Sequence, residues 1–447
     1  MLQCGFYEKE ITPPLGSDIP GYFMKRPSTG VLDRLYAKAF AVSDGTTSAV
    51  LIEIDAVELP VKNRDAITAH IHAMTGLAPE HVAVCATHTH YGIPAGEPLG
   101  SEEDVPFMTE FCRIAADCAA LALRQIQPCT LSFGVGSVDG MSFNRDYLMA
   151  DGSVRTNPSD VPVSEIVRHY AENDPELPVL YAANADGQPL GALIGFACHQ
   201  DCIGGTQYSG DFSSELSRRL KARYGADFVS VYLAAPSGDI NHLDFMTGHA
   251  TDYRELGCIL AAEAAHVIAS AAQPVAYARV QAQIQRIRCR YRRADAETLR
   301  RAEQIVAGGP DNGHNMLGTL QAELLVAYER KATAAHWYEG ELPVQVFLIG
   351  DLPVFIMPGE LYHQFGHTLK DACGGRCLIA TLSNGFFGYI PVPELFGTNV
   401  YPVQLCEGSM WQPEAGAMLT DCAIKMLQHM MELSLIHISE PTRHAQI

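Results

Sequence analysis

The sequence predicts an α/β fold: a single large domain with mixed β-sheets flanked by helices, and a functional site at convergent strand ends. Short apolar segments with the pattern of strands alternate with amphipathic segments along 447 residues, a length that can form one large core. Three of the apolar strands end in polar turns that contain a histidine: His88, His199 and His242. Because α/β folds place binding sites at the ends of their strands, these turns form the candidate site.

Composition limits the possible partners. Hydrophobic residues make up 47% of the chain and charged residues 18%, as in globular proteins. The 31 basic and 51 acidic residues give a formal charge of −20, and no Lys/Arg-rich run is present. This balance argues against binding to nucleic acid or to anionic membranes. We therefore expect a small-molecule substrate, neutral or amphiphilic; the oligomeric state is open.

The cysteines and the first residues of the chain bear on its compartment. Thirteen cysteines are scattered through apolar segments, which is typical of reduced, buried thiols. Cys198 and Cys202 bracket His199, but one such pair is a weak indication of a metal cluster. The start of the chain shows no signal-peptide pattern and no stretch predicts a transmembrane segment, so a cytoplasmic location is expected.

The first third of the chain predicts a hairpin followed by two helices. These elements are the strands 36–43 and 48–54, which turn at Asp44-Gly45, and the helices 61–74 and 104–126. Between the two helices lies the apolar segment that leads to His88 and His90. Since side chains alternate along an extended chain, these two histidines should point to the same side, one able to bind a metal and the other to face a substrate.

Two further segments of the middle third carry candidate residues. After a strand at about 129–138, a polar segment contains Arg145, which is suited to holding a carbonyl or an oxyanion. A second hairpin turns at Asp186-Gly187 and leads to the strand that ends at His199. The strand at 228–233 then ends at a turn that contains Asp239 and Asn241.

The last third predicts helices at about 295–307 and 316–334, and then strands at 343–350 and 353–357. Glu360 follows the second strand, near the start of a helix. Glu360, His363 and His367 share a helical face and could form a local metal site. The preferred alternative is that Glu360 alone points to the centre, as the carboxylate partner of the other histidines, and that His363 and His367 are solvated.

The C-terminal region predicts an amphipathic helix from about 413 to 431. The peptide that follows, residues 433–447, resembles the translation of a transposon adapter used in DNA sequencing. We therefore expect a domain of residues 1–432 and a non-native tail of residues 433–447.

Several motifs together resemble one known family. They occur in the order found in the N-terminal, catalytic domain of the neutral/alkaline non-lysosomal ceramidases and cover nearly the whole chain: Ile11-Thr-Pro-Pro, Thr87-His-Thr-His-Tyr-Gly, Asn144-Arg145, Phe196-Ala-Cys-His199, Tyr208-Ser-Gly-Asp-Phe, Gly238-Asp-Ile-Asn, Pro358-Gly-Glu360 and Gly388-Tyr389-Ile.

The resemblance implies a zinc hydrolase that cleaves an N-acyl amide bond. By position, the zinc ligands would be His88, His199, Glu360 and Tyr389, with His90 and Arg145 binding the scissile group.

The chain departs from this family at several places. Asn241 stands where the family has a serine proposed as nucleophile, so zinc-activated water, oriented by His90 or Asp239, is the expected nucleophile. A Tyr-Glu pair of the family reads Cys406-Glu407 here, with Tyr401 nearby as a substitute, so Asn241 and Tyr401 are the expected substrate-binding residues. The chain also has no room for the family's immunoglobulin-like C-terminal domain. These departures leave two alternatives open: a metal-dependent hydrolase of a sugar-derived or peptide-like amide or ester, and a non-catalytic metal-containing binding protein.

Overall fold

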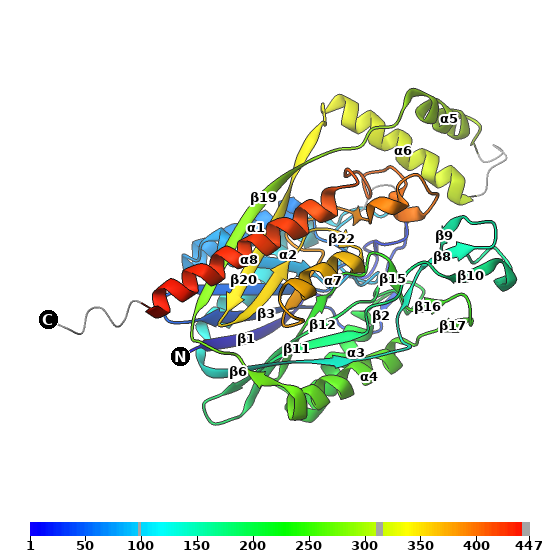
Figure 1. The fold of residues 1–447 in the computed structure, drawn as a ribbon. Coiled ribbons are helices and arrows are strands. Elements are labelled where there is room, and N and C mark those ends of the chain that lie inside the picture. The colour runs from blue at the N-terminus through cyan, green and yellow to red at the C-terminus, as the bar shows by residue number, and fades with distance from the viewer. Residues whose placement is uncertain (97–99, 310–315, 440–447) are drawn as a thin grey trace.

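A computed structural model describes residues 1–96, 100–309 and 316–439. Its elements form four layers in one main domain: helices, a nine-stranded sheet, a four-stranded sheet and further helices (Figure 1). The predicted α/β class with mixed sheets flanked by helices is therefore confirmed. In the described ranges, no helix is long and apolar enough to cross a membrane.

The nine-stranded sheet is mixed. Its order is β14-β12-β11-β6-β1-β3-β4-β5, with β18 paired to β6; the β12–β14 and β4–β5 pairs are parallel and the others antiparallel. The strands are β1 (Gln3–Glu10), β3 (Tyr36–Ser43), β4 (Ser48–Ile54), β5 (Val82–Ala86), β6 (Gln127–Ser137), β11 (Glu176–Asn184), β12 (Pro189–Phe196), β14 (Val229–Ala234) and β18 (Gln273–Pro274). Both predicted hairpins are present, as β3–β4 and β11–β12.

Four helices cover one face of this sheet: α1 (Val61–Thr75), α2 (Val105–Arg124), α3 (Asp211–Tyr224) and α4 (Tyr253–His266). Their apolar positions recur at three-to-four spacing, as in the α2 residues Phe111, Ala115 and Cys118, which are all buried against the strands. Asp211 is the first residue of α3, and its carboxylate accepts hydrogen bonds from Phe212 N and Cys202 N.

The opposite face packs on the second sheet, whose order is β19-β20-β21-β23. Its strands are β19 (Val280–Arg290), β20 (Glu339–Ile349), β21 (Leu352–Ile356) and β23 (Leu378–Ala380). The outer side of this sheet is covered by α7 (His363–Ala372) and α8 (Ala415–Ser439), and α8 lies along β19 and β20 (Figure 1). The remaining helices, α5 (Ala296–Ala307) and α6 (Met316–Ala334), form the connection between β19 and β20.

The ends of distant strands meet because the large sheet curls. β5 is the last strand of the sheet order and β14 the first, yet β14 contacts both β4 and β5. Beyond β5 and β12, a parallel bridge pairs Thr89 with Gln200, and His90 N donates to Gln200 O over 3.0 Å. The two histidine-bearing turns are thereby brought to one place.

Short strand pairs position the rest of the site. Parallel pairing of β22 (Glu360–Leu361) with β24 (Tyr389–Ile390) sets Glu360 opposite Tyr389. Antiparallel pairing of β7 (Phe143–Asn144) with β15 (Ile240–Asn241) brings the Arg145 loop beside the turn after β14.

Candidate metal centre and pocket

His88 and His199 face one carboxylate oxygen. Their Nε2 atoms each lie 3.3 Å from Oε2 of Glu360, and all three side chains are buried. Their imidazole rings are 4.5 Å apart between centroids. The predicted association of Glu360 with the histidines of the other strand ends is therefore present in the structure.

The other ring nitrogen of each histidine contacts a backbone carbonyl. His88 Nδ1 lies 2.8 Å from Val57 O, and His199 Nδ1 lies 2.9 Å from Ile240 O. A carbonyl oxygen can only accept, so each Nδ1 carries hydrogen, and in the neutral imidazole each Nε2 presents a lone pair. This is the arrangement by which proteins orient metal-binding imidazoles.

The backbone around His88 differs from the extended chain expected from the sequence. β5 ends at Ala86, and His88 has φ 72°, in the left-handed region. A non-glycine residue in that region is strained and is often found at functional sites. The chain is not extended at His88, so alternation of side chains does not explain the positions of the two histidines. The rings of His88 and His90 nevertheless lie together, 5.0 Å apart between centroids.

Several atoms of the centre are buried without a hydrogen-bond partner among the described residues: His88 Nε2, His90 Nε2, His199 Nε2 and Glu360 Oε2. Unpaired buried polar atoms are costly, and four of them at one place indicate a missing ligand. Candidate ligand atoms of His88, His90 and His199 all lie within 4.8 Å of one another. The residues present therefore fit a metal ion.

The charges agree with this fit. Burial, together with Arg145 and His88, lowers the pKa of His199 to about 4, so its imidazole is neutral, as a metal ligand must be. Burial and the neighbouring His88 and His199 hold the pKa of His90 well below its usual value. Burial by itself would raise the pKa of Glu360, but His88 and His199 outweigh it and keep the carboxyl ionised.

Tyr389 and Arg145 adjoin Glu360. Strand pairing sets Tyr389 opposite Glu360, and the Arg145 guanidinium carbon lies 5.3 Å from the centre of the Tyr389 ring. Burial raises the pKa of Tyr389, while Arg145 opposes the rise. Arg145 is itself buried; Tyr389 and Glu360 raise its pKa against the effect of burial, and its Nη2 donates to Gly238 O over 2.6 Å.

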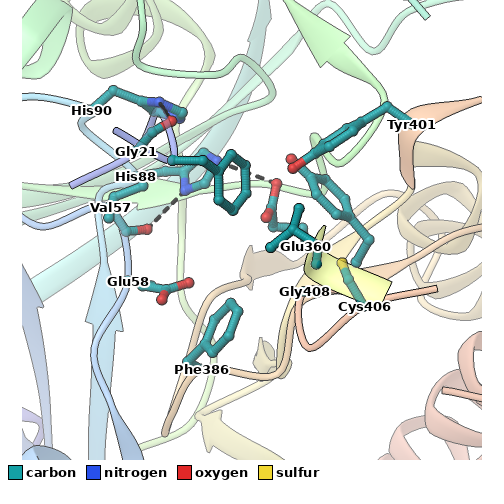
Figure 2. Close-up of a pocket in the computed structure, with 13 residues that line it drawn as sticks. Gly21, Val57, Glu58, His88, His90, Glu360, Phe386, Tyr401, Cys406 and Gly408 are labelled. Carbon is teal, nitrogen blue, oxygen red and sulfur yellow. Dashed lines mark hydrogen bonds and ion pairs between the residues drawn. The ribbon is translucent and has the colours of Figure 1, made fainter. Parts of the chain in front are cut away.

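A pocket opens onto this centre (Figure 2). Its open space, including solvent at the mouth, is ≈ 580 Å³. Its wall is formed by metal-centre residues and by mostly apolar or small residues: Gly21, Phe23, Val57, Glu58, His88, His90, Leu324, Glu360, Phe386, Tyr389, Tyr401, Cys406 and Gly408.

Four of the predicted site residues are not part of this wall: His199, which faces Glu360, Arg145, which lies against the Tyr389 ring, and Asp239 and Asn241. Asp239, considered for orienting water, is fully buried; its carboxylate accepts from Asn144 Nδ2, His363 N and His363 Nδ1. Asn241, considered for substrate binding, donates to Asn157 Oδ1 over 2.8 Å and accepts from Leu243 N. Both side chains are thus engaged in holding loops behind the pocket.

The local site of Glu360, His363 and His367 is not formed. Glu360 lies in β22 and α7 begins only at His363, so the three residues do not share one helix face. The expectation that both histidines are solvated holds only for His367, because His363 is buried against Asp239.

Tyr401 lines the pocket, and the centroid of its ring is 5.5 Å from that of Tyr389. Sequence reasoning missed Glu58 and Phe23 in the same wall. Glu58 could have been found, because it is an acidic residue just after a predicted apolar strand, the signal used for the other turns. Phe23 follows no such strand, and only the structure brings it to the pocket.

Comparisons with known proteins agree with this architecture. No protein-family model matches the chain. The structure of neutral ceramidase from Pseudomonas aeruginosa matches 96% of this chain and 74% of that chain, with TM-score 0.73 and 19% sequence identity. A structure described as ceramidase complexed with C2 matches 96% of this chain and 75% of that chain, with TM-score 0.72 and 17% identity. The resemblance drawn from the motifs is thus confirmed at the level of architecture, and the chain has the fold of neutral ceramidase.

Proposed function

We propose that this protein is a zinc-dependent hydrolase that cleaves an amide bond in a small neutral or amphiphilic molecule. One observation carries the metal assignment: the two 3.3 Å separations between Glu360 Oε2 and the histidine Nε2 atoms. Ligand atoms about 2.0–2.1 Å from a tetrahedral zinc ion stand about 3.3 Å apart, so the spacing is that of adjacent zinc ligands. Amide hydrolysis is proposed from the ceramidase fold.

The proposed ligands are His88, His199, Glu360 and Tyr389. Two neutral imidazoles, a carboxylate and a phenol oxygen form a nitrogen and oxygen set that suits zinc. A zinc ion held there would polarise the scissile carbonyl and lower the pKa of a water molecule to about 7.

His90 is the proposed proton acceptor. Its Nδ1 contacts Gly21 O at 3.1 Å, which orients the lone pair of its buried Nε2 toward the histidine pair. That lone pair can take a proton from water and return it to the departing amine nitrogen. This role falls to His90 and not to Asp239, whose carboxylate is already committed to Asn144 and His363.

Arg145 is the proposed oxyanion stabiliser. Its guanidinium is buried, donates to Gly238 O, lies against the Tyr389 ring, and has its Nε unpaired among the described residues. A cation held in place before the reaction stabilises the negative charge that develops on a carbonyl oxygen. Tyr401, beside Tyr389 in the pocket wall, is the proposed substrate contact.

The proposed compartment is the cytoplasm. All thirteen cysteines are free thiols, most of them buried, which supports a reducing environment.

Metal analysis with a substrate panel tests the proposal. We expect about one zinc per purified chain, and loss of most of it in His88→Ala and His199→Ala, with no loss in the control His367→Ala, whose side chain is 44% exposed outside the pocket. The panel contains N-acyl amides, sugar-derived and peptide-like amides, and matched esters. Turnover of the N-acyl amides supports the proposal, whereas turnover confined to the other compounds would select the non-lipid hydrolase.

Two results would reject the proposal in different ways. Full zinc occupancy in both histidine variants would reject the ligand set. A zinc-loaded protein that turns over no member of the panel would favour the binding-protein alternative.

A further inference from the structure

The second sheet has an open edge at β19. This strand is at the end of the sheet order, pairs among the described strands with β20 alone, and runs along α8 toward α5 (Figure 1). Val280 N donates to Asp44 Oδ2 over 2.8 Å, and at the other end of the strand Arg290 N donates to Gln412 Oε1 over 2.9 Å. Because the N–H and C=O groups of alternate residues in an antiparallel strand point to the same side, the even-numbered residues of β19 face away from β20.

The backbone between these two ends is unpaired on its outer side. The outward-facing residues are Ala282, Ile284, Arg286 and Arg288, and in the part of the chain that the structure describes no residue bonds to their outward N–H or C=O groups. Their side chains are half-buried or exposed. An unpaired edge of this kind is a template to which another extended chain can add as a strand. Residues 282–288 span roughly 20 Å at about 3.3 Å per residue, enough for a segment of about six residues.

A groove runs beside this edge. It has two parts, which share Ala282 and Gln283 of β19. The rest of the lining away from β19 comes from the β3–β4 turn, from α1 and from the segment before β5: Asp44, Thr46, Thr47, Arg64, Pro79, Glu80 and His81. A chain in the groove would therefore contact the open backbone of β19 and the side chains of these other elements together.

The groove contains arginines whose hydrogen bonds are incomplete. Arg279 and Arg286 line it near β19, and Arg64 lines it from α1. Arg64 is 7% exposed; its Nη1 lies 3.2 Å from Asp65 Oδ1, but its Nε is buried without a partner in the described ranges, as is Nη1 of Arg279. Burial lowers the pKa of Arg64, and Arg286 lowers it further against the opposing effect of Asp65. Two neighbouring guanidinium groups thus repel each other here, and an anion between them would relieve this repulsion.

The acidic side chains of the groove do not supply that anion. The Asp44 carboxylate accepts from Val280 N, Thr46 N and Thr47 N, whereas Glu80 is exposed. No ion pair between these two carboxylates and the three arginines is present among the described residues. A second copy of this chain suits the edge poorly, because strand pairing would bring the β19 arginines of both copies together and like charges on paired strands are destabilising.

We propose that the open edge of β19 binds an extended acidic segment of a partner protein, which adds to the second sheet as a strand and places a carboxylate between Arg64 and Arg286. Backbone hydrogen bonds to the outward-facing residues hold the segment, and the arginines select its acidic side chains. The groove shares no lining residue with the pocket of the metal centre. The proposal is therefore independent of the hydrolase.

Fluorescence anisotropy of the full-length protein with a labelled peptide of alternating valine and glutamate tests the proposal. The peptide is about nine residues long, to cover the open edge at about 3.3 Å per residue. We expect a Kd below about 100 µM at low ionic strength. The peptide with lysine in place of glutamate should bind at least about tenfold more weakly. Hydrogen exchange of the β19 amides should slow in the complex.

Two variants separate the backbone from the charge. Ile284→Pro removes an outward N–H that the pairing with β20 does not use, so the fold should persist while the peptide binds about tenfold more weakly. Arg286→Glu should weaken binding by about tenfold or more, because repulsion replaces attraction. The matched control, Arg113→Glu, changes a residue of α2 that is 64% exposed outside the groove, and should alter Kd by less than about twofold. Thermal unfolding and zinc content check that each variant is folded.

Four results would overturn the proposal. One is no binding of the acidic peptide up to about 1 mM. Another is an equal Kd in the wild type and in both variants. If inorganic phosphate displaces the peptide and only Arg286→Glu weakens binding, the groove is an anion site without an added strand. If sedimentation shows a dimer that Ile284→Pro dissociates, a second copy of the chain occupies the edge.

Discussion

At the scale of single residues, the centre depends on backbone carbonyls as much as on its own side chains. Val57 O fixes the ring of His88, Ile240 O that of His199 and Gly21 O that of His90. Each carbonyl determines which nitrogen carries hydrogen, and so which lone pair faces inward. Gly21 has φ 118°, and a Cβ there would lie 2.7 Å from His90 Nδ1, so only glycine brings its carbonyl this close.

Arg145 and Asn241 should give contrasting kinetic effects. We expect Arg145→Ala to lower kcat by about two to three orders of magnitude, as loss of one oxyanion donor does. Asn241→Ala should lower it by less than about tenfold, because the Asn241 side chain bonds to Asn157 and Leu243 and acts on Arg145 only through Asn157, whose N donates to Arg145 O. Steady-state kinetics at equal zinc content measures both changes, and equal losses would contradict the separation of their roles.

The same experiment addresses the nucleophile. With an asparagine at position 241, we expect attack by water and no covalent acyl-enzyme. Mass spectrometry of the quenched reaction should therefore show unmodified protein. An acyl group on any side chain, or a burst of first product equal to the enzyme concentration, would refute attack by water.

At this scale, the sequence predicted which side chains come together where each of them follows the end of a strand. His88, His199 and Glu360 each follow an apolar strand, and the structure brings them together. The sequence did not indicate that Asn241 bonds to Asn157 outside the pocket wall, because whether a side chain at a turn faces the pocket or a neighbouring loop depends on tertiary hydrogen bonds. Those bonds join segments far apart in the chain and leave no local pattern.

At the scale of elements, one buried ion pair holds the curled sheet together beneath the site. Lys38 of β3 and Glu53 of β4 face each other across the hairpin, with Nζ 3.1 Å from Oε1, and both are almost fully buried. Oε2 of Glu53 accepts from Tyr232 N of β14 over 2.8 Å, which joins the two ends of the sheet order. Burial by itself would lower the pKa of Lys38, but Glu53 and Asp55 raise it, so the ammonium is charged.

Lys38→Met should be strongly destabilising. It leaves the Glu53 carboxylate buried without its cation, a change that costs about 3–5 kcal/mol in free energy of unfolding. The double variant Lys38→Met/Glu53→Gln should recover much of this loss, because an amide oxygen still accepts from Tyr232 N and carries no charge. Denaturant unfolding measures both, and a single variant no less stable than the double would show that the charge is not the cause.

At the contact between α3 and α4, the hydrogen bonds of Glu215 predict that the free energy of unfolding depends on pH. Burial by itself raises the pKa of Glu215, but hydrogen bonds from Arg218, Arg219 and the Cys258 thiol bring it to about 2. A carboxyl whose pKa is lower in the folded state stabilises the fold above its unfolded pKa of about 4.5, and this stabilisation is lost as pH falls toward 2.

Glu215→Gln should therefore cost about 1 kcal/mol at pH 7, a small value because both arginines are largely exposed. The difference from wild type should shrink by more than half at pH 3. Thermal unfolding at pH 7, 4 and 3 measures it. A difference that stays constant over this range would mean that packing, not charge, accounts for the effect.

The extents of the elements were also largely predictable. The hairpins and helices α1, α2, α5 and α6 lie within a few residues of their expected bounds, since each has a clear periodicity and a turn signal. The pairing of β22 with β24 was not expected, because two-residue strands are too short to show any alternation. Those short strands nevertheless set Glu360 opposite Tyr389.

At the scale of the whole molecule, the layers place three apolar cores around two sheets. The helices α1–α4 close one core, the two sheets enclose a second, and α7 and α8 close the third. The sequence indicates the classes of these elements but not their layering, because both faces of a buried strand are apolar and do not identify their partners. Only the long-range contacts determine which helix covers which sheet.

The C-terminal part of α8 shows how far the apolar core between the second sheet and the helices α7 and α8 extends. Met426, Leu427 and Met430 are buried against the second sheet, and Gln281 Nε2 of β19 donates to Met430 O over 3.2 Å. Met431, by contrast, is 49% exposed. Among the α8 residues whose burial is described, up to 433, Met430 is the last buried one; residues 433–447, interpreted from the sequence as a non-native tail, follow it, and α8 runs to Ser439.

Deleting residues 433–447 should lower the free energy of unfolding by less than about 1 kcal/mol, because this segment is interpreted as a non-native tail and begins after Met430, the last α8 residue described as buried. A longer deletion, of residues 426–447, is the matched control: it removes Met426, Leu427 and Met430 and should cost several kcal/mol, at about 2–5 kcal/mol for each large side chain lost from a core. Denaturant unfolding of the three proteins measures both effects. A loss beyond about 2 kcal/mol in the shorter deletion would show that residues after 432 pack on the core and that the domain does not end where the sequence suggests.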